Sequence, residues 1–310
     1  MDFGEINQRR LRYFREVIQH GSIRSTADAL NTAPSVLTRQ LRLLEGEIGA
    51  VLFERSPRGM IPTEAAHALL DYWRGCESER QAFESTLQQL NGLQTGTVRV
   101  GISEGLIDSL LQDVLNDFIQ NHPRLQIHLT ALPANDIVTE VQNDIVHFGI
   151  AYNPAPAPRV VFAASGAYPL RLIVAKSHPL AKTAEPISFG DAIAYPMALM
   201  TNAFGNGQII DALAIKAGVR LTPSLTTNSV AALKRFVESG AGISFMGHSP
   251  YIHPPKSKSL VALILDSEIA ESAHARLLLR QDRRLPFAAA ALLSVIKKKM
   301  QIFCRTGATG

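Results

Sequence analysis

The chain has 310 residues, of which 46% are hydrophobic and 19% charged, a composition typical of globular rather than disordered proteins. This length allows two or three compact units with buried cores. The formal net charge of +4 is compatible with nucleic-acid binding without establishing it. The longest apolar run, 287–296, is about half the length of a membrane helix, and no secretory signal pattern opens the chain. We therefore expect a cytoplasmic protein without membrane contact.

The two cysteines, Cys76 and Cys304, are far apart in the sequence and belong to no paired motif. This usage fits a reducing compartment and argues against a disulfide framework. The segment 178–180, His-Pro-Leu, indicates a turn, and no second histidine or carboxylate stands at metal-ligand spacing. We expect neither a metal ion nor a cofactor.

Short helices with sharp breaks are predicted in the first sixty residues. Helical spacing runs through 11–18 and stops before Gly21, where glycine suits a helix end. Ser22 is placed to cap a second helix. A break follows at 31–33, and Pro34 suits the first turn of a third helix.

The third helix has one apolar stripe and an outer face of short polar and basic side chains. The stripe consists of Leu37, Leu41, Leu44 and Ile48. Off the stripe lie Ser35, Thr38, Arg39 and Arg42, with Gln40 near its edge. A short helix, a tight break and such a helix indicate a helix-turn-helix, whose second member enters the major groove of DNA. Arginine and glutamine there read base edges or hold phosphates; plain three-helix packing is the alternative.

The segment 52–65, L-F-E-R-S-P-R-G-M-I-P-T-E-A, indicates a wing, with Arg55 and Arg58 placed to contact backbone phosphates. All basic residues of 1–62 are arginine, nine of them against seven acidic residues. Guanidinium groups suit bidentate contacts with phosphate and guanine. On charge alone, a solvated surface remains the alternative.

A long helix is predicted from Thr63, which is placed to cap it. A heptad pattern runs through Ala66, Leu69, Trp73, Cys76, Arg80, Phe83, Leu87 and Leu90. A helix of about 28 residues would be roughly 42 Å long, which favours dimerisation through Leu69, Trp73, Phe83 and Leu87. The alternative is a helix packed on the core of its own chain. The segment 91–96 indicates a hinge.

The stretch 11–55 resembles the amino-terminal domain of LysR-type transcriptional regulators. The matching motifs are A-x-x-L before the turn, T-R-Q-L-R-x-L-E in the third helix and G-x-x-L-F-E-R before the wing. The resemblance implies a mostly helical winged helix-turn-helix that binds double-stranded DNA, and a linker helix that pairs subunits into a dimer or tetramer. Ala33 and Pro34 depart from the commoner pattern, which puts contacts of the first helical turn in doubt.

From residue 97 onward, strands and helices alternate, which predicts an α/β fold. Strands are predicted at 97–102, 126–130, 148–152, 170–175, 196–200, 225–227, 243–246, 260–265 and 276–280. Helices are predicted near 107–121, 135–143, 206–217, 229–239 and 287–299.

This part resembles the LysR effector-binding domain, which has two lobes like those of periplasmic binding proteins. The matching segments are V-R-V-G-I, L-I-V-A-K-S-H-P-L-A and T-N-S-V-A-A-L-K-R-F-V-E-S-G-A-G-I-S-F-M. The implied division is a DNA-binding domain at 1–62, a linker helix and hinge at 63–96, and an effector domain at 97–310. Lobe one takes 97–169 and 266–303, and lobe two takes 170–265. His147 replaces a common aspartate, and we assign it no ligand role.

The resemblance places a small-molecule effector between the lobes. The implied contacts are Ser103, Glu104, Thr201, Asn202, Asn228 and His248. Hydroxyls and free amides at helix starts suit a carboxylate or another polar metabolite. Glu104 disfavours a wholly anionic ligand unless its side chain points away. Simple helix caps are the alternative for Thr201 and Asn228.

The segment 101–105, G-I-S-E-G, also fits the G-x-S-x-G elbow of α/β serine hydrolases, with Ser103 as nucleophile. However, the elbow normally follows several strands, whereas Ser103 ends the first strand of its domain. No His-Gly-Gly oxyanion segment is present, and a hydrolase has no need of a DNA-reading head. A periplasmic solute-binding protein would leave 1–91 without a role. We therefore predict a regulator and no enzyme.

Overall fold

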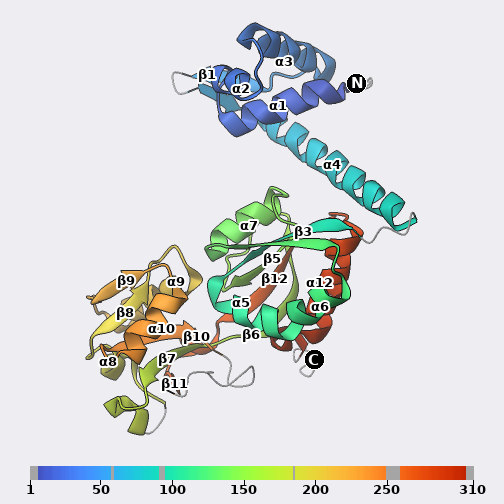
Figure 1. Ribbon diagram of the computed structural model, residues 1–310. Helices are drawn as coiled ribbons and strands as arrows, with labels where there is room; N and C mark the ends of the chain where they lie inside the picture. The colour runs from blue at the N-terminus through green and yellow to red at the C-terminus, as the bar shows by residue number, and fades with distance from the viewer. Residues whose placement is uncertain (1–5, 57–58, 91–94, 184–185, 249–258, 305–310) are drawn as a thin grey trace. The chain divides into compact units, whose positions relative to one another are not determined.

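The structure is a computed structural model that describes residues 6–56, 59–90, 95–183, 186–248 and 259–304 (Figure 1). Its internal contacts divide the chain into two compact units, Met1–Arg80 and Gln81–Gly310. The long helix α4 (Glu64–Leu90) runs through this boundary. Within the described ranges, no helix is both long and apolar enough to cross a membrane.

The amino-terminal unit consists of three helices followed by a hairpin. Its elements are α1 (Gln8–His20), α2 (Ile23–Ala29), α3 (Pro34–Ile48), β1 (Phe53–Ser56) and β2 (Gly59–Pro62). Gly21, at φ +69°, ends α1, and the Ser22 hydroxyl accepts a hydrogen bond from the Ser25 amide at 3.1 Å to cap α2. Ala33 gives α3 no side-chain cap. The predicted helix-turn-helix and hairpin are confirmed.

A single hydrophobic core holds this unit together. Leu37, Leu41 and Leu44 of α3 are buried. Phe14 of α1 is fully buried, and its ring centroid lies 5.6 Å from that of Phe53 in β1. Burying each such side chain stabilises the fold by roughly 1.5–3 kcal/mol. Because the leucine stripe must face inward, the opposite face of α3 is fixed toward the outside.

Helix α4 has 27 residues, so it is about 40 Å long. The Thr63 hydroxyl accepts a hydrogen bond from the first turn at 3.2 Å, as predicted. In the first half of the helix, Leu69 is buried in the amino-terminal core and Trp73 packs against it. The Arg15 guanidinium lies 5.2 Å from the centre of the Trp73 ring. This half therefore belongs to the core of its own unit.

The first lobe of the carboxyl-terminal unit is built on a five-stranded sheet. Its strands are β3 (Gly96–Ile102), β4 (Leu125–Ala131), β5 (Phe148–Tyr152), β6 (Val160–Ala167) and β12 (His274–Arg280). They lie in the order β4-β3-β5-β12-β6. β3 pairs in parallel with β4 and β5, whereas β12 is antiparallel to β5 and β6.

Helices of the first lobe pack against this sheet. They are η1 (Glu104–Leu106), α5 (Ile107–Leu110), η2 (Leu111–Leu115), α6 (Asn116–Asn121), α7 (Ala134–Gln142), α12 (Phe287–Lys299) and α13 (Gln301–Cys304). The segment η2 is a π-helical turn that joins α5 to α6 inside the helical run predicted from 107 to 121. The amide of Phe287, the first residue of α12, donates to the hydroxyl of Ser85 in α4 at 2.9 Å.

The second lobe has a five-stranded sheet in the order β11-β7-β10-β8-β9. Its strands are β7 (Leu170–Ala175), β8 (Met197–Met200), β9 (Leu225–Thr227), β10 (Ile243–Gly247) and β11 (Leu260–Ile264). Its helices are η3 (Pro179–Lys182), α8 (Phe189–Ala192), α9 (Gly205–Ala217) and α10 (Val230–Glu238). β8, β9 and β10 are parallel to one another, and β7 is antiparallel to β10 and β11.

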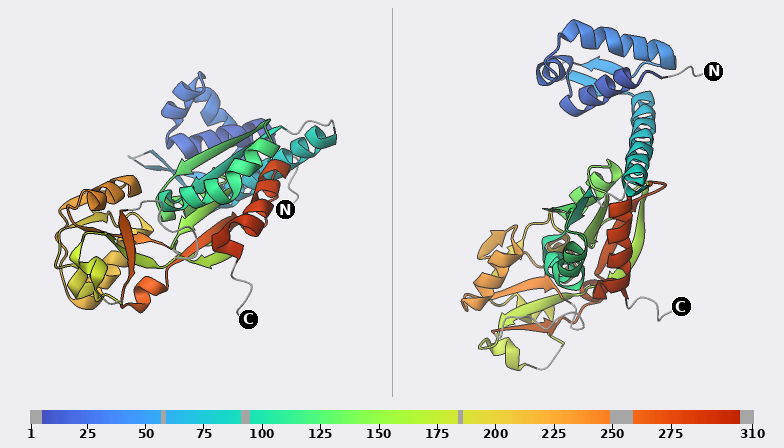
Figure 2. Two further views of the ribbon diagram at one scale, coloured as in Figure 1. Left: turned by 60° about the horizontal axis from the view of Figure 1, so that its bottom comes forward. Right: turned by 45° about the vertical axis from the view of Figure 1, so that its right-hand side comes forward.

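Two chain segments connect the lobes, as the views in Figure 2 show. The chain leaves lobe one between β6 and β7, and it returns from β11 through α11 (Glu268–Glu271) to β12. In each lobe the carboxyl ends of the parallel strands are followed by turns and helix starts. Ligands of open α/β sheets bind at such ends.

The nine predicted strands are all present, but β6 was not predicted. Its sequence, V-V-F-A-A-S-G-A, has no regular alternation and contains residues with low strand propensity. β6 is an edge strand with several exposed positions, so only its pairing with β12 defines it. The short helices α8, α11 and α13 were also not predicted, because single turns have too little periodicity to detect.

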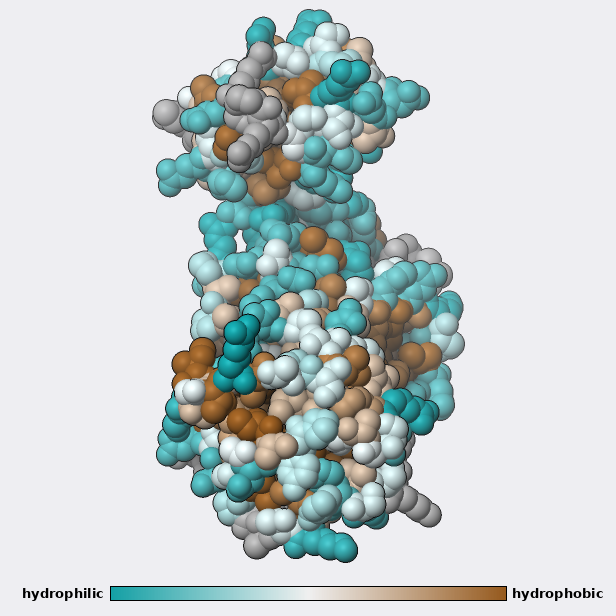
Figure 3. All heavy atoms as spheres, turned by 90° about the vertical axis from the view of Figure 1, so that its left-hand side faces the viewer, coloured by the Kyte–Doolittle hydropathy of each residue, from teal (hydrophilic) through white to brown (hydrophobic). Residues whose placement is uncertain are grey.

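Hydrophobic side chains on the face shown in Figure 3 are interspersed with hydrophilic ones, with several separate hydrophobic patches. Scattered apolar surface of this kind is normal for a folded protein. The more informative hydrophobic surface lies on α4, where Phe83 is 63% exposed and Leu87 is 44% exposed.

Candidate functional site

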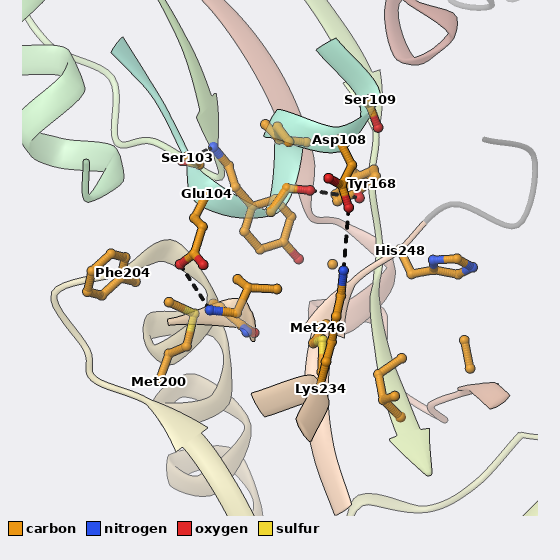
Figure 4. Close-up of a pocket in the computed structure, with 18 of the residues that line it drawn as sticks. Ser103, Glu104, Asp108, Ser109, Tyr168, Met200, Phe204, Lys234, Met246 and His248 are labelled. Atoms are coloured by element: carbon orange, nitrogen blue, oxygen red, sulfur yellow. Dashed lines mark hydrogen bonds and ion pairs between the residues drawn. The ribbon is translucent and has the colours of Figure 1, made fainter. Parts of the chain in front are cut away.

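A cavity of about 440 Å³ lies between the two lobes of the carboxyl-terminal unit. Lobe one and its link to lobe two contribute Ser103, Glu104, Leu106, Asp108, Ser109, Gln112, Tyr152 and Tyr168. Lobe two contributes Ile173, Met200, Phe204, Gly205, Asn206, Val230, Lys234, Glu238, Met246, His248 and Leu260. The volume falls within the range of small-molecule sites. Figure 4 shows labelled side chains of both lobes around this space.

Ser103 stands at the carboxyl end of β3 and connects two strands. Its amide donates to the carbonyl of Ile150 at 2.9 Å, and its hydroxyl oxygen accepts from the amide of Tyr152 at 3.0 Å. The hydroxyl proton remains free to donate toward the cavity. Its backbone, at φ −69° and ψ 130°, is ordinary extended chain. A nucleophile elbow requires a sharp, strained turn, which this conformation does not provide.

Glu104, at the start of η1, reaches across to the second lobe (Figure 4). Its carboxylate accepts a hydrogen bond from the Val230 amide at 2.9 Å and one from the Ser229 hydroxyl at 3.3 Å. Both donors stand at the amino end of α10, where the helix dipole favours negative charge. A side chain of lobe one therefore occupies the anion-binding end of a helix in lobe two.

A second polar contact connects lobe one to α10. The Lys234 ammonium of α10 lies 3.6 Å from the Asp108 carboxylate of α5. The two side chains are 46% and 73% exposed, so solvent screens the pair and its contribution to stability is small. The pair nevertheless neutralises two of the charges beside the cavity.

Two tyrosines form the floor of the cavity near the link between the lobes. The rings of Tyr152 and Tyr168 meet edge to face with centroids 5.7 Å apart. Tyr168 donates to the carbonyl of Gly105 at 3.5 Å, whereas the Tyr152 hydroxyl has no hydrogen-bond partner among the described residues. Burial raises the pKa of both phenols, to about 12 for Tyr168, so both are neutral and able to donate.

The start of α9 forms another wall, where the two lobes approach closely. A Cβ atom at Gly205 would collide with the carbonyl oxygen of Tyr152, so only glycine allows this contact. The next residue, Asn206, is 6% exposed and donates from its Nδ2 atom to the Phe245 carbonyl at 2.7 Å. Its Oδ1 atom has no partner among the described residues.

Of the six predicted effector contacts, Ser103, Glu104 and His248 line the cavity, and three do not. Burial, together with the nearby Arg171 and Lys234, lowers the pKa of His248, which is therefore neutral at pH 7. The remaining three predicted contacts are Thr201, Asn202 and Asn228, which lie in turns next to the cavity wall.

The three positions outside the lining are each a few residues from residues that do line the cavity. After β8, the wall is formed by Phe204 and Asn206 instead of Thr201 and Asn202. Before α10, the cap is Ser229 rather than Asn228; its hydroxyl accepts from the Ala232 amide at 3.4 Å. Element boundaries drawn from sequence alone carry errors of this size.

Several lining residues were not predicted. Tyr152 ends a strand that is buried throughout, and the rule that ligands bind at strand carboxyl ends could have identified it. Asn206 follows a glycine in the first turn of α9, which is a weaker signal of the same kind. Asp108 and Lys234 stand inside helices, where nothing in the local sequence distinguishes them from surface residues.

In the amino-terminal unit, the outer face of α3 forms a shallow depression lined by Ser35, Thr38, Arg39, Arg42 and Leu43. Arg39 and Arg42 are exposed, and no described residue pairs with either guanidinium. The Thr38 hydroxyl donates to the Pro34 carbonyl at 2.9 Å, so its oxygen can still accept a hydrogen bond. The predicted polar and basic face is therefore accessible.

The other predicted DNA contacts have different surroundings. Gln40 accepts a hydrogen bond from Arg10 of α1 at 3.2 Å, and Arg10 also pairs with Glu47. The Gln40 side chain is thus engaged in packing α1 on α3. Arg55 belongs to β1, but its side chain lies outside the described part of the structure, and Arg58 lies wholly outside the described residues.

Comparison with known proteins identifies both units. The chain matches the model of the LysR substrate binding domain over residues 91–301. It matches the model of the bacterial regulatory helix-turn-helix protein, lysR family, over residues 8–67. These matches cover most of the chain, and neither model describes a hydrolase.

Similar proteins extend over the full length. The RuBisCO operon transcriptional regulator of Allochromatium vinosum is 24% identical over 306 residues, which covers 97% of this chain and 99% of the relative. The structure also resembles full-length OxyR from Pseudomonas aeruginosa, with a TM-score of 0.65, 15% identity and coverage of 95% and 99%. Full-length CbnR complexed with its target DNA gives a TM-score of 0.51, 21% identity and coverage of 97% and 100%.

The two structural likenesses support the fold, and the two family models support the function. One model describes a regulatory helix-turn-helix and matches the amino-terminal unit. The other describes a substrate binding domain and matches the unit that contains the interlobe cavity. The chain belongs to the LysR family of DNA-binding transcriptional regulators, which carry an effector-binding domain and are not enzymes.

Proposed function

We propose that the outer face of α3 reads the major groove of an operator, and that a small molecule in the interlobe cavity modulates this binding. The observation that carries the DNA half of the proposal is the pair Arg39 and Arg42, which are exposed beside Ser35 and Thr38 and have no partner among the described residues. An unpaired guanidinium on a helix that must enter a groove can donate two hydrogen bonds to guanine or to phosphate. Because its DNA partner is in the cytoplasm, the regulator acts there.

The wing and Gln40 have supporting roles in this proposal. Arg55 and Arg58 stay predicted phosphate contacts: Arg55 belongs to β1, which follows the reading helix, and Arg58 lies outside the described residues. Gln40 is bound to Arg10, so it supports the orientation of α3 and must leave that contact to reach a base. Arg39 and Arg42 are therefore the strongest base or phosphate contacts.

The proposed effector site is the cavity between the lobes. Its wall combines buried apolar side chains with a few polar groups, which is the composition of small-molecule sites. Because both lobes contribute to the wall, a ligand there has different contacts when the lobes move relative to each other. Only such a difference allows a ligand to shift a conformational equilibrium.

Self-association is proposed through the second half of α4. Phe83 and Leu87 stand one helical turn apart and are exposed. Exposed apolar surface of this kind is unfavourable in water and often marks a protein–protein contact. A second copy of the same helix is the occupant we propose, since paired reading heads suit a two-fold operator. Leu69 and Trp73, predicted for the same role, pack mainly in the core of their own unit. Whether the protein forms a dimer or a tetramer depends on this surface and on further contacts between subunits.

The domain division predicted from the sequence is part of the proposal. It assigns 1–62 to DNA binding, 63–96 to the linker and hinge, and 97–310 to effector binding, with lobe one at 97–169 and 266–303. The strands of lobe two, β7 to β11, all fall within 170–265, which supports the division between the lobes. The boundary between the compact units falls within the linker helix.

A matched pair of arginine variants tests the DNA-binding proposal. Arg39→Ala and Arg235→Ala each remove one exposed guanidinium, the first from α3 and the second from α10, where the side chain is 85% exposed. We expect Arg39→Ala to weaken binding to DNA from upstream of its own gene by about 1–3 kcal/mol. Arg235→Ala should leave the affinity within twofold, as measured by mobility shift at fixed salt.

Circular dichroism should show unchanged folding of both variants, because neither guanidinium has a role in a core. If Arg39→Ala binds this DNA as tightly as the unmodified protein, the assignment of α3 as the reading helix is wrong. If Arg235→Ala loses as much affinity for DNA, both variants weaken binding by lowering the net positive charge, and not by removing a base or phosphate contact.

A further inference from the structure

Each charged group in the described part of the cavity wall already has a compensating partner within the protein. The Glu104 carboxylate accepts from Val230 and Ser229 at the positive end of α10. That helix start, which could otherwise hold the carboxylate of a ligand, is occupied by a side chain of the protein itself. A second negative charge placed beside Glu104 would be repelled by it.

The other charged side chains of the wall are compensated in the same way. Asp108 pairs with Lys234 at 3.6 Å, and Glu238 pairs with Arg235 at 3.2 Å. His248 is neutral, because burial and nearby cations lower its pKa. Among the residues that the structure describes, neither a cationic nor an anionic ligand therefore meets an uncompensated opposite charge in this wall.

The groups that the described part of the wall leaves unpaired are neutral. The Tyr152 hydroxyl and the Asn206 Oδ1 atom are buried in residues that are 7% and 6% exposed, and neither has a partner among the described residues. The orientation of Asn206 follows from chemistry: Nδ2 must face the Phe245 carbonyl, so Oδ1 is an acceptor. The Tyr152 hydroxyl can both donate and accept. Burial of a neutral polar group without a partner has a desolvation cost, which a ligand that pairs with the group can recover.

We infer that the effector of the cavity is an uncharged, largely apolar molecule with one head group that both donates and accepts hydrogen bonds. This inference rests on the proposed function of the cavity. A primary amide matches this description, because it carries both an N–H for an acceptor such as Asn206 Oδ1 and a carbonyl for a donor such as the Tyr152 hydroxyl. The apolar body contacts Met200, Phe204 and Met246. The carboxylate alternative from the sequence is the less favoured one, because Glu104 already occupies the start of α10.

One feature of the wall could still favour an anion. The first turn of α9, at Gly205 and Asn206, has no side-chain cap and no acidic residue, so its amides present partial positive charge. This helix start contributes roughly half a charge, whereas Glu104 contributes a full negative charge on the opposite wall. The balance predicts preference for a neutral ligand, and an anionic probe is the critical comparison.

Three probes with the same apolar body and different head groups measure how the charge of the head group affects binding. They are 4-phenylbutanamide, 4-phenylbutanoate and 4-phenylbutylamine, titrated into the full-length protein by calorimetry at pH 7.5. We expect the amide to bind about tenfold more tightly than either charged probe, since only the amide pairs both free atoms without charge repulsion. Equal or tighter binding of a charged probe overturns the inference, and so does absence of amide binding.

Tyr152→Phe distinguishes ligand recognition from a merely structural hydroxyl. Removing an unpaired buried hydroxyl should leave the melting temperature of the free protein unchanged or raise it. The same change should weaken amide binding by about tenfold. If the amide binds Tyr152→Phe as tightly as the unmodified protein, the hydroxyl does not contact the ligand and the inference fails.

Glu104→Gln tests the role of the internal carboxylate. Glutamine keeps an acceptor for the Val230 amide but removes the negative charge. We expect the affinity for 4-phenylbutanoate to rise by about tenfold and that for the amide to stay within twofold. An unchanged preference among the three probes contradicts the charge argument. Mobility shift on the same proteins keeps the two proposals apart: intact DNA binding without amide binding overturns only this inference.

Discussion

At the scale of single residues, His147 is a buried titratable group of the first lobe that is held by two backbone contacts. It is 2% exposed, its Nδ1 atom accepts from the Arg99 amide at 3.1 Å, and its own amide donates to the Arg99 carbonyl at 2.8 Å. Burial, with Arg283 and Arg99 nearby, lowers the pKa of His147 to about 3. The imidazole therefore extends the β3–β5 pairing as a neutral acceptor, and the absence of a ligand role stays our prediction.

This geometry predicts an acid sensitivity. Between pH 6.5 and about 3, the unfolded chain binds a proton at His147 and the folded chain does not, so the free energy of unfolding falls as the pH falls. The expected loss is about 1.4 kcal/mol per pH unit below 6.5, and none above it. His147→Asn, which keeps an acceptor but cannot titrate, should remove this part of the slope in urea unfolding series. Parallel slopes for the two proteins would contradict the assignment.

How far single residues could be predicted depends on whether their role is local. Ser103 and Glu104 follow a strand, and a rule about strand ends is enough to place them at the cavity. Asp108 and Lys234 also line the cavity, but they stand inside helices and have no distinctive neighbours in the sequence. The bond from Glu104 to Val230 joins residues 126 positions apart, so no local pattern contains it.

At the scale of elements, α4 has two halves with different surroundings. The first half packs on the core of the amino-terminal unit through Leu69, whereas Phe83 and Leu87 of the second half are exposed. Its heptad pattern was correctly predicted as a helix, yet the pattern alone cannot distinguish packing on its own core from packing on a partner. Both occur along the same helix if our proposal for self-association holds.

The exposed pair gives a prediction about assembly. Phe83→Ala with Leu87→Ala should raise the dissociation constant of the dimer at least about tenfold, because both side chains lose the apolar surface buried against the partner. Analytical ultracentrifugation over a concentration series measures the change. Glu84→Ala, also an exposed position of this helix, serves as control and should have less than a twofold effect. Equal behaviour of the double variant and the control would exclude this surface from the interface.

Elements with strong periodicity were predictable, and those defined by pairing were not. The stripe through Leu37, Leu41 and Leu44 fixes α3 and its outward face without reference to the rest of the chain. The edge strand β6 has no such pattern, and β12 supplies its register from more than a hundred residues away. Sheet order likewise depends on contacts between distant segments.

At the scale of the whole molecule, separate hydrophobic cores predict separate unfolding. One core gathers side chains from Leu11 to Leu70, and the largest core of the other unit gathers residues from Val98 to Phe303. We expect two transitions in calorimetry. Leu44→Ala, at a fully buried position of the first core, should destabilise only one of them, by about 2–5 kcal/mol.

A ligand of the interlobe cavity should shift the other transition. At a hundredfold excess over its dissociation constant, the ligand stabilises the unit that binds it by about 2.7 kcal/mol. Leu43→Ala, next to Leu44 but 40% exposed, is the matched control and should move neither transition appreciably. A single transition that responds to both Leu44→Ala and ligand would show that the units unfold together.

The bond between Ser85 and Phe287 determines how the effector-binding part can be isolated. The first amide of α12 is satisfied by a hydroxyl from the end of α4, 202 residues earlier in the chain. The family model for this part begins at residue 91, beyond that hydroxyl. A fragment cut at that limit exposes the first turn of α12 and loses a capping contact that is typically worth about 1 kcal/mol. Ligand affinities measured on a truncated protein would therefore refer to a weakened lobe, and a fragment intended to preserve it must start before Ser85.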